Sequence, residues 1–350
     1  MLLDDSTNMV FRILPLGQQR HAGGDEAETA DNAGFVLRIH AIGQHSTPAI
    51  HEELQWLLAI RRETALIVPA PVPAHDGSLI QEIPAPGEPT PRQCVLFHWV
   101  PGDFRNDTLT PNDMQCVGAF MAQLYCHADQ FIASQTPPPT RRALFCDMHT
   151  WMDAPGKAAA HFSAEELAVF AAAAQRVHTT VQELGESQDV FGFIHADLHQ
   201  WNYVFHGEEV RAIDFDDCGW GYYTYDMAVT LSYLEDWGTF PALQDAFLTG
   251  YQRVRPLPRR YAAALPRTVK SGVPVKLFRV GHLTLMRTPV VKRQRSLRAD
   301  CAHCFRWGSA ERRPSLATCS VFIAVGWCPN VAAPHPAGGA HPGAPDRGTW

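Results

Sequence analysis

The residues His195-Ala-Asp197-Leu-His199-Gln-Trp-Asn202 are followed, eleven positions later, by Ile213-Asp214-Phe215-Asp216-Asp217. In this stretch an aspartate stands five residues before an asparagine, and a second aspartate follows inside a short apolar run. Phosphoryl transfer needs a carboxylate that orients the acceptor hydroxyl, and oxygen ligands that hold a cation on the phosphates. The pattern therefore predicts a phosphoryl-transfer site in which Asp197, Asn202 and Asp214 supply these groups.

The spacing between the two motifs predicts a β-hairpin. Two apolar segments, 203–205 and 210–213, flank the polar turn 206–209, as in two paired strands. Asp214 leaves the second strand close to where the first motif ends, so Asn202 and Asp214 should lie at the same end of one small sheet. A hard cation that prefers oxygen ligands, such as Mg²⁺, could then be shared between them.

Other polar residues of the stretch have less specific assignments. His195 is predicted to brace the loop through hydrogen bonds rather than to transfer a proton, and His199 is treated as a loop residue. Asp217 is expected to be a solvated loop acid. Asp216 is left open between a ligand for a second Mg²⁺ and a loop acid.

The motifs HADLHQWN and IDFDD resemble those of the aminoglycoside phosphotransferase and choline kinase-like group, which has the protein-kinase-like fold. The resemblance covers about residues 8–255. It implies that Asp197 is the catalytic base and that Asn202 and Asp214 are metal ligands. It also implies that Asp226 is a structural acid near the start of the next helix, and that ATP and Mg²⁺ are the cofactors.

The order of predicted elements fits the α+β, two-lobed architecture that this resemblance implies. We expect a β-rich N-terminal nucleotide-binding lobe over residues 1–101 and a larger, helical catalytic lobe over residues 102–258, with nucleotide bound between them. The periodicity predicts strands over 8–13, 35–40 and 94–100, extended chain over 68–73, and helices over 49–63, 111–133, 163–184, 224–236 and 240–253.

The small lobe lacks the lysine that such enzymes place on the strand before their first helix. Residues 1–156 contain no lysine, and Arg38 is the only cation on that strand. We expect Arg38 to pair with Glu53, because the helical face with Leu54 and Leu57 packs inward, and to contact the nucleotide phosphates. The alternative is an ordinary surface ion pair.

The rest of the nucleotide site is less defined. The hinge backbone near Trp99 and Val100 is expected to meet the adenine ring. No G-x-G-x-x-G pattern precedes the second strand, so either the phosphate cover is degenerate or the N-terminus is truncated.

Composition favours a cytoplasmic protein. No stretch reaches the apolar length of a membrane span, the N-terminus lacks the features of a secretory signal, and nine scattered cysteines suit a reducing compartment. Residues 1–255 carry 14 basic and 33 acidic side chains, a net charge of −19, which favours a small cationic hydroxyl acceptor. Homoserine-like and protein serine acceptors stay open, and the sequence does not indicate an oligomeric state.

Residues 259–350 differ from the rest of the chain. From residue 256 onward there are 15 basic and 3 acidic residues, and prolines interrupt the apolar pattern. We expect a poorly ordered, basic tail rich in Pro, Arg and Cys, and we hypothesise an out-of-register translation, which resequencing the locus would test. A zinc site at Cys301-Ala-His-Cys304 has poor ligand spacing, and the tail shows no nucleic-acid-binding module.

Together these patterns predict an ATP-dependent kinase for a small hydroxyl compound of aminoglycoside, choline or homoserine type. A pseudokinase that binds nucleotide or a partner without turnover is one alternative, favoured by the missing lysine and glycine loop and opposed by the intact Asp197, Asn202 and Asp214. A metal-dependent hydrolase is another, and it would lack the hinge and the Arg38–Glu53 pair.

Overall fold

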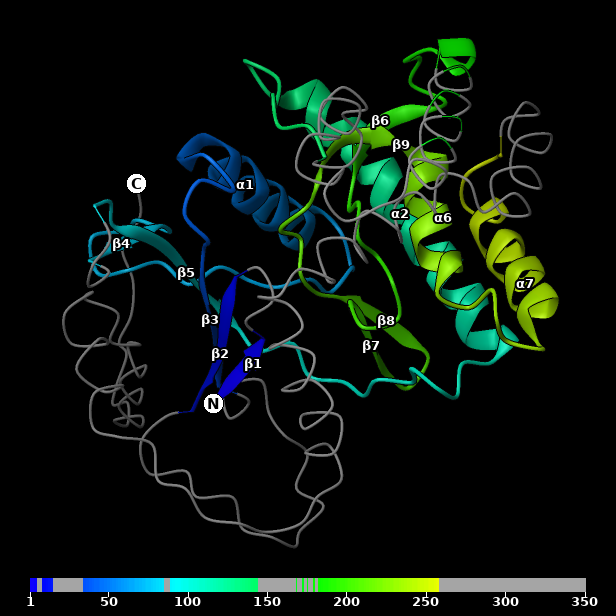
Figure 1. Cartoon of the computed structure of the whole chain (residues 1–350), viewed down its shortest axis with the longest axis horizontal. Helices are drawn as coiled ribbons and strands as arrows, with labels where there is room; N and C mark the ends of the chain where they lie inside the picture. The colour runs from blue at the N-terminus through cyan, green and yellow to red at the C-terminus, as the bar shows by residue number, and fades with distance from the viewer. Residues whose placement is uncertain are drawn as a thin grey trace, which may run out of the picture.

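The computed structural model describes residues 1–4, 8–14, 34–84, 89–143 and 182–257, together with positions 168, 172, 175 and 179. An N-terminal antiparallel sheet with one helix beside it is followed by a second region, in which helices stand next to two small β ribbons (Figure 1). Most of the helix predicted over 163–184, and all of the tail from residue 259, lie outside the described residues.

Five strands form the N-terminal sheet in the order β1-β2-β3-β5-β4, and each neighbouring pair is antiparallel. Leu37 lies opposite Phe11 on one side and Leu96 on the other, within a small apolar cluster. The sequence predicts the three central strands, whereas β1 and β4 are too short, at three residues each, to show an alternating pattern. The strands are β1 (Leu2–Asp4), β2 (Met9–Ile13), β3 (Phe35–Ile39), β4 (Gln81–Ile83) and β5 (Arg92–His98).

Helix α1 (Thr47–Glu63) follows β3 and begins close to where the sequence predicts. The Ser46 hydroxyl accepts a hydrogen bond from the Ala49 N–H, and a proline occupies the first turn, so the helix start is both capped and preorganised. The apolar face of α1 is fully buried around Leu54 and Leu57, and it carries Glu53, also with no exposed surface. A buried carboxylate needs a partner, so this face already indicates an ion pair in the interior.

The second region contains α2 (Pro111–Ser134), α6 (Tyr223–Ser232) and α7 (Phe240–Gln252). α2 and α7 pack at very close range, because a Cβ on Gly250 would lie 1.9 Å from the Gln115 carbonyl oxygen. α6 is shorter than the predicted helix 224–236, since the chain enters a series of turns after Ser232.

Two ribbons fix the loops that carry the sequence motifs. β6 (Phe191–Ile194) pairs with β9 (Gly219–Tyr222), and β7 (Tyr203–His206) forms the predicted hairpin with β8 (Glu209–Ala212). The loop 195–202 therefore joins β6 to β7, and the loop 213–218 joins β8 to β9. Because β6 pairs with β9 and β7 pairs with β8, strand pairing holds the two loops next to each other at both of their ends. Strand β9 shows no alternation in its Gly-Trp-Gly-Tyr sequence and could not be predicted.

The segment between the two regions is attached to β7. Gly102 has a φ of +151°, and a Cβ there would lie 2.7 Å from the Val204 side chain, so only glycine fits without strain. Directly afterwards, Asp103 and Phe205 exchange two backbone hydrogen bonds of 2.9 Å. Among the described residues, no helix has the length and apolar character needed to cross a bilayer.

Candidate active site

The two motif loops meet at the open end of the β7–β8 hairpin. The Ile213 N–H donates to the Asn202 carbonyl at 2.9 Å, which places Asp214 next to the asparagine as the spacing predicts. The Asn202 side-chain nitrogen donates to both the carbonyl oxygen and Oδ2 of Asp197, each at 2.9 Å. Since both amide hydrogens are used, the Oδ1 of Asn202 is the atom left to meet a cation.

Two residues of these loops have left-handed backbone conformations that non-glycine residues rarely adopt. Ala196 has a φ of 71° and Asp214 a φ of 62°. Each such residue costs about 1–3 kcal/mol and persists only where the surroundings enforce it, most often at functional sites. The strained residues are Ala196, next to Asp197, and Asp214 itself. The fold therefore constrains the orientation of these two carboxylates.

His195 braces both loops, as the sequence predicts. Its Nδ1 accepts a hydrogen bond from the Asp197 N–H at 3.3 Å, and its Nε2 lies 3.1 Å from the Ile213 carbonyl oxygen. Burial lowers the pKa of His195 to about 4, so the ring is neutral near pH 7 and carries its proton on Nε2. The ring therefore links the two loops and is not placed to exchange a proton.

Asp226 holds the loop 195–202 in place from the interior of the protein. It lies in the first turn of α6 without exposed surface, and its Oδ2 accepts hydrogen bonds from the His195 N–H and the Tyr125 hydroxyl, each at 3.0 Å. Burial raises the pKa of Asp226 to about 6, although these hydrogen bonds act in the opposite direction. The contacts agree with the structural role that the resemblance implies.

Arg38 forms the predicted pair with Glu53. Its Nη2 lies 2.7 and 2.8 Å from the two carboxylate oxygens of Glu53, and neither side chain has more than a few per cent of its surface exposed. The alternative of a surface ion pair is therefore wrong. The other guanidinium nitrogen, Nη1, lies 3.8 Å from Asp214 and 3.7 Å from Asp216, so Arg38 connects the N-terminal sheet to the second motif.

Asp214 is exposed, with 49% of its side-chain surface open to solvent. Desolvation by the surrounding protein atoms, followed by the negative charge of Asp216, raises the pKa of Asp214 to about 7, and Arg38 opposes the shift. A carboxylate that is reachable, half protonated at neutral pH and surrounded by other acids gains from a bound cation. Together with the free amide oxygen of Asn202, Asp214 thus fits a hard divalent metal ion.

Asp216 is a buried acceptor rather than a loop acid. Its Oδ2 accepts from Asn8 at 2.6 Å and from Gln44 at 3.3 Å, and His45 lies 3.3 Å from the same oxygen. Burial alone would raise the pKa of Asp216, but Arg38 and the hydrogen bond from His45 outweigh it and hold that pKa well below its usual range. These donors all meet Oδ2, whereas Oδ1 of Asp216 is buried without a hydrogen-bond partner and lies 3.7 Å from Arg38.

Arg141 is a buried member of this network that sequence reasoning missed. It donates to the carbonyl oxygens of Asp216 and of Ala49, and it lies 3.6 Å from Glu53. The residue follows a proline-rich segment after α2 and belongs to no motif, so nothing in the sequence indicates its role.

Asp217, expected to be solvated, is only partly exposed. Burial, together with the charges of neighbouring acids, raises the pKa of Asp217 well above its usual value.

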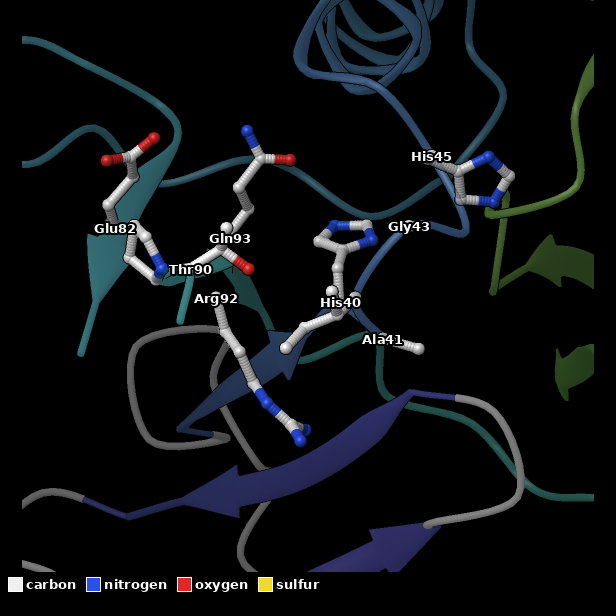
Figure 2. Close-up of a pocket in the computed structure, with 10 residues that line it drawn as sticks. His40, Ala41, Gly43, His45, Glu82, Thr90, Arg92 and Gln93 are labelled. Atoms are coloured by element: carbon white, nitrogen blue, oxygen red, sulfur yellow. The ribbon is translucent and has the colours of Figure 1, made fainter. Parts of the chain in front are cut away.

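The expected hinge residues, Trp99 and Val100, follow β5 and are half-buried. The Trp99 N–H already donates to the Gly34 carbonyl at 3.1 Å, so it is not available to a nucleotide, and the Arg12 guanidinium stacks 3.8 Å from the Trp99 ring centroid. A separate cavity of about 260 Å³ lies between residues 40–45 and the β4–β5 edge (Figure 2). It is lined by none of the predicted site residues.

Solved structures show which class of protein has this fold. A microcompartment-associated aminopropanol kinase matches with a TM-score of 0.64 and 28% identity, over 82% of this chain and 83% of that one. An amicoumacin kinase also matches with a TM-score of 0.64, at 19% identity, over 79% of each chain. The protein therefore has the two-lobed, protein-kinase-like α+β fold, and it is of the small-molecule kinase class.

The chain belongs to the phosphotransferase enzyme family, whose sequence model matches residues 25–264. An uncharacterised protein of Deinococcus radiodurans is 32% identical over 247 residues, covering 67% of this chain and 68% of that protein. A homoserine kinase of Neisseria meningitidis is 28% identical over 256 residues, covering 70% of this chain and 74% of that enzyme. The resemblance first seen in the two motifs thus extends over most of the chain.

Proposed function

We propose that the protein transfers the γ-phosphoryl group of ATP to a hydroxyl group of a small molecule. The observation that carries the proposal is the convergence of Asp197 and Asn202 at 2.9 Å beside the turn that holds Asp214. One carboxylate next to two oxygen-bearing side chains is the set of groups that phosphoryl transfer requires.

Asp197 is the proposed catalytic base. Asn202 holds its Oδ2, and a quarter of the side-chain surface is exposed, so the carboxylate is both oriented and accessible. Asp197 takes the proton of the acceptor hydroxyl, the hydroxyl oxygen bonds to the γ-phosphorus, and the bond from that phosphorus to the β–γ bridging oxygen breaks. ADP leaves with the electron pair of that bond.

Asn202 and Asp214 are the proposed ligands of Mg²⁺. When bound, the ion neutralises negative charge on the phosphates. The raised pKa of Asp214, about 7, supports this role. The negative charges of the neighbouring acids favour the protonated form of Asp214, and a bound cation would compensate these charges in place of the proton. An amicoumacin kinase of the same fold has been solved with AMP-PNP and Ca²⁺, which makes a nucleotide analogue and a divalent ion the natural probes here.

Arg38 takes the place of the missing lysine in this proposal. Glu53 holds one edge of its guanidinium, and the other nitrogen points toward Asp214, where the phosphates would lie. The lobes are assigned as residues 1–101 and 102–258, with adenine at the hinge. Because the Trp99 N–H is already used, the backbone of Val100 is the better candidate for that contact.

We assign the acceptor to compounds that carry both a hydroxyl and an ammonium group. The enzymes named above for homoserine and aminopropanol act on such compounds. Residues 1–255 carry a net charge of −19, which attracts cations. In addition, Trp201 of the Asp197 loop is 46% exposed, its ring centroid lies 5.3 Å from that of Tyr233, and an exposed indole binds cations through its face.

The test is ADP formation from ATP and Mg²⁺ with a panel of hydroxyl compounds. Amino alcohols should give turnover, whereas diols of equal size without nitrogen should give at least about tenfold less. Asp197→Ala should bind nucleotide and lose turnover. Phosphate release that needs no acceptor would instead identify a hydrolase. Nucleotide binding without turnover for any acceptor would contradict the proposal and favour a pseudokinase.

A further inference from the structure

We infer that His199, which the sequence leaves as a loop residue, is a positioning residue for Asp197. His199 directs its Nε2–H at the Oδ2 of Asp197 and, together with Asn202, fixes the carboxylate so that Oδ1 is presented to the acceptor hydroxyl. The inference rests on the proposed function, in which Asp197 is the base.

The side chains of His199 and Asp197 lie close together. His199 Nε2 lies 3.4 Å from Asp197 Oδ2, and the two side chains are 14% and 25% exposed. Oδ2 accepts a hydrogen bond from Asn202 at 2.9 Å, so Asn202 and the His199 Nε2 face the same oxygen. A carboxylate held at one oxygen has a single orientation left for the other.

The hydrogen bond to Nδ1 fixes the position of the imidazole proton. His199 Nδ1 accepts a hydrogen bond from the Trp201 backbone N–H at 3.2 Å, so in the neutral ring the proton is on Nε2. Asn202 also lies 3.4 Å from Nε2, but both hydrogens of its amide are already donated to Asp197. Nε2 is therefore a donor, and Asp197 Oδ2 is the acceptor within its reach.

Contacts with two aromatic rings keep the imidazole from turning away from Asp197. Its centroid lies 4.8 Å from that of Tyr233 and 5.5 Å from that of Trp201, and the latter two rings also contact each other. Tyr233 comes from the end of α6, whereas Trp201 belongs to the same loop as His199. Contacts from two elements hold the imidazole in the orientation that serves Asp197.

A spectroscopic experiment tests this without nucleotide. In ¹⁵N-labelled full-length protein, the imidazole signals of His199, identified by their loss in His199→Leu, should show the Nε2-protonated tautomer. In Asp197→Ala the Nε2 signal should shift, because its acceptor is gone. A proton on Nδ1, or a signal unaffected by Asp197→Ala, would overturn the inference even if the protein proves not to be a kinase.

A kinetic experiment separates positioning from simple folding support. His199→Leu should lower kcat by about 10- to 100-fold, the range that loss of orientation at a reacting group produces, with the KM for ATP within about twofold. His199→Gln retains an N–H donor and should recover most of the loss. His206, exposed at the end of β7, gives the matched controls His206→Leu and His206→Gln, which should behave like the wild type.

The outcomes are distinct. Full kcat in His199→Leu would overturn the inference, and so would equal losses in the Leu and Gln variants with a parallel drop in melting temperature, because that indicates a packing role. If the wild-type protein shows no acceptor-dependent turnover, the proposed function fails, while the tautomer measurement still decides whether His199 donates to Asp197.

Discussion

Glu53→Gln removes one negative charge from the buried network of Arg38, Glu53, Arg141 and Asp216, and it leaves the side-chain volume almost unchanged. Glu53 has no exposed surface, holds Arg38 through two contacts of 2.7 and 2.8 Å, and lies 3.6 Å from Arg141. Loss of its charge leaves two buried guanidinium groups with Asp216 as their main remaining buried counter-charge. Breaking a buried pair on one side typically costs about 3–5 kcal/mol, because the partner charge stays desolvated.

Chemical denaturation at 25 °C would measure the change in unfolding free energy directly. At about 2–4 °C per kcal/mol for a domain of this size, the melting temperature should fall by roughly 6–20 °C. Glu63→Gln is the matched control, since Glu63 ends the same helix but is 39% exposed, and it should behave like the wild type. If Glu53→Gln melts within about 2 °C of the wild type, the reasoning from buried charge is refuted.

Three further outcomes are expected. Asp197→Asn should keep its fold and nucleotide affinity but lose kcat by at least about 100-fold, measured by ADP formation. Because Asp214 has a pKa of about 7 and must lose its proton to bind a cation, apparent Mg²⁺ affinity should fall about tenfold from pH 8 to pH 6, and this dependence should vanish in Asp214→Asn. Gly250→Ala should destabilise the α2–α7 contact by about 1–3 kcal/mol through its clash with Gln115, whereas Gly238→Ala, which has open space, should not.

The local part of the site could be predicted because its members are close in the chain. Asp197 and Asn202 share one loop, and the hairpin of β7 and β8 returns the chain to Asp214, so short-range geometry alone brings them together. The pairing of Arg38 with Glu53 could also be predicted, since a strand followed by a helix offers few partners across 15 residues.

The proposed hinge residues, Trp99 and Val100, show what a sequence leaves undetermined. The sequence indicates that Trp99 and Val100 connect the two lobes, but it does not reveal which backbone groups are free. The Trp99 N–H is used by Gly34, which lies opposite it at the end of the β3–β5 strand pair, and the Pro101 carbonyl accepts from Arg211. Such contacts depend on the packed fold, because a backbone group carries no sequence signature of its own.

The sequence by itself determined the class of chemistry, through the residue types and spacings between His195 and Asp217, since a loop and a hairpin of fixed length leave little freedom. Only the tertiary structure decided how that chemistry is held. Asn8 reaches Asp216 across 208 residues and Arg141 reaches it across 75, and Asp216 becomes a buried acceptor for these donors. Contacts at such separations arise when packed elements exclude water and force polar groups to find partners, which no local pattern records.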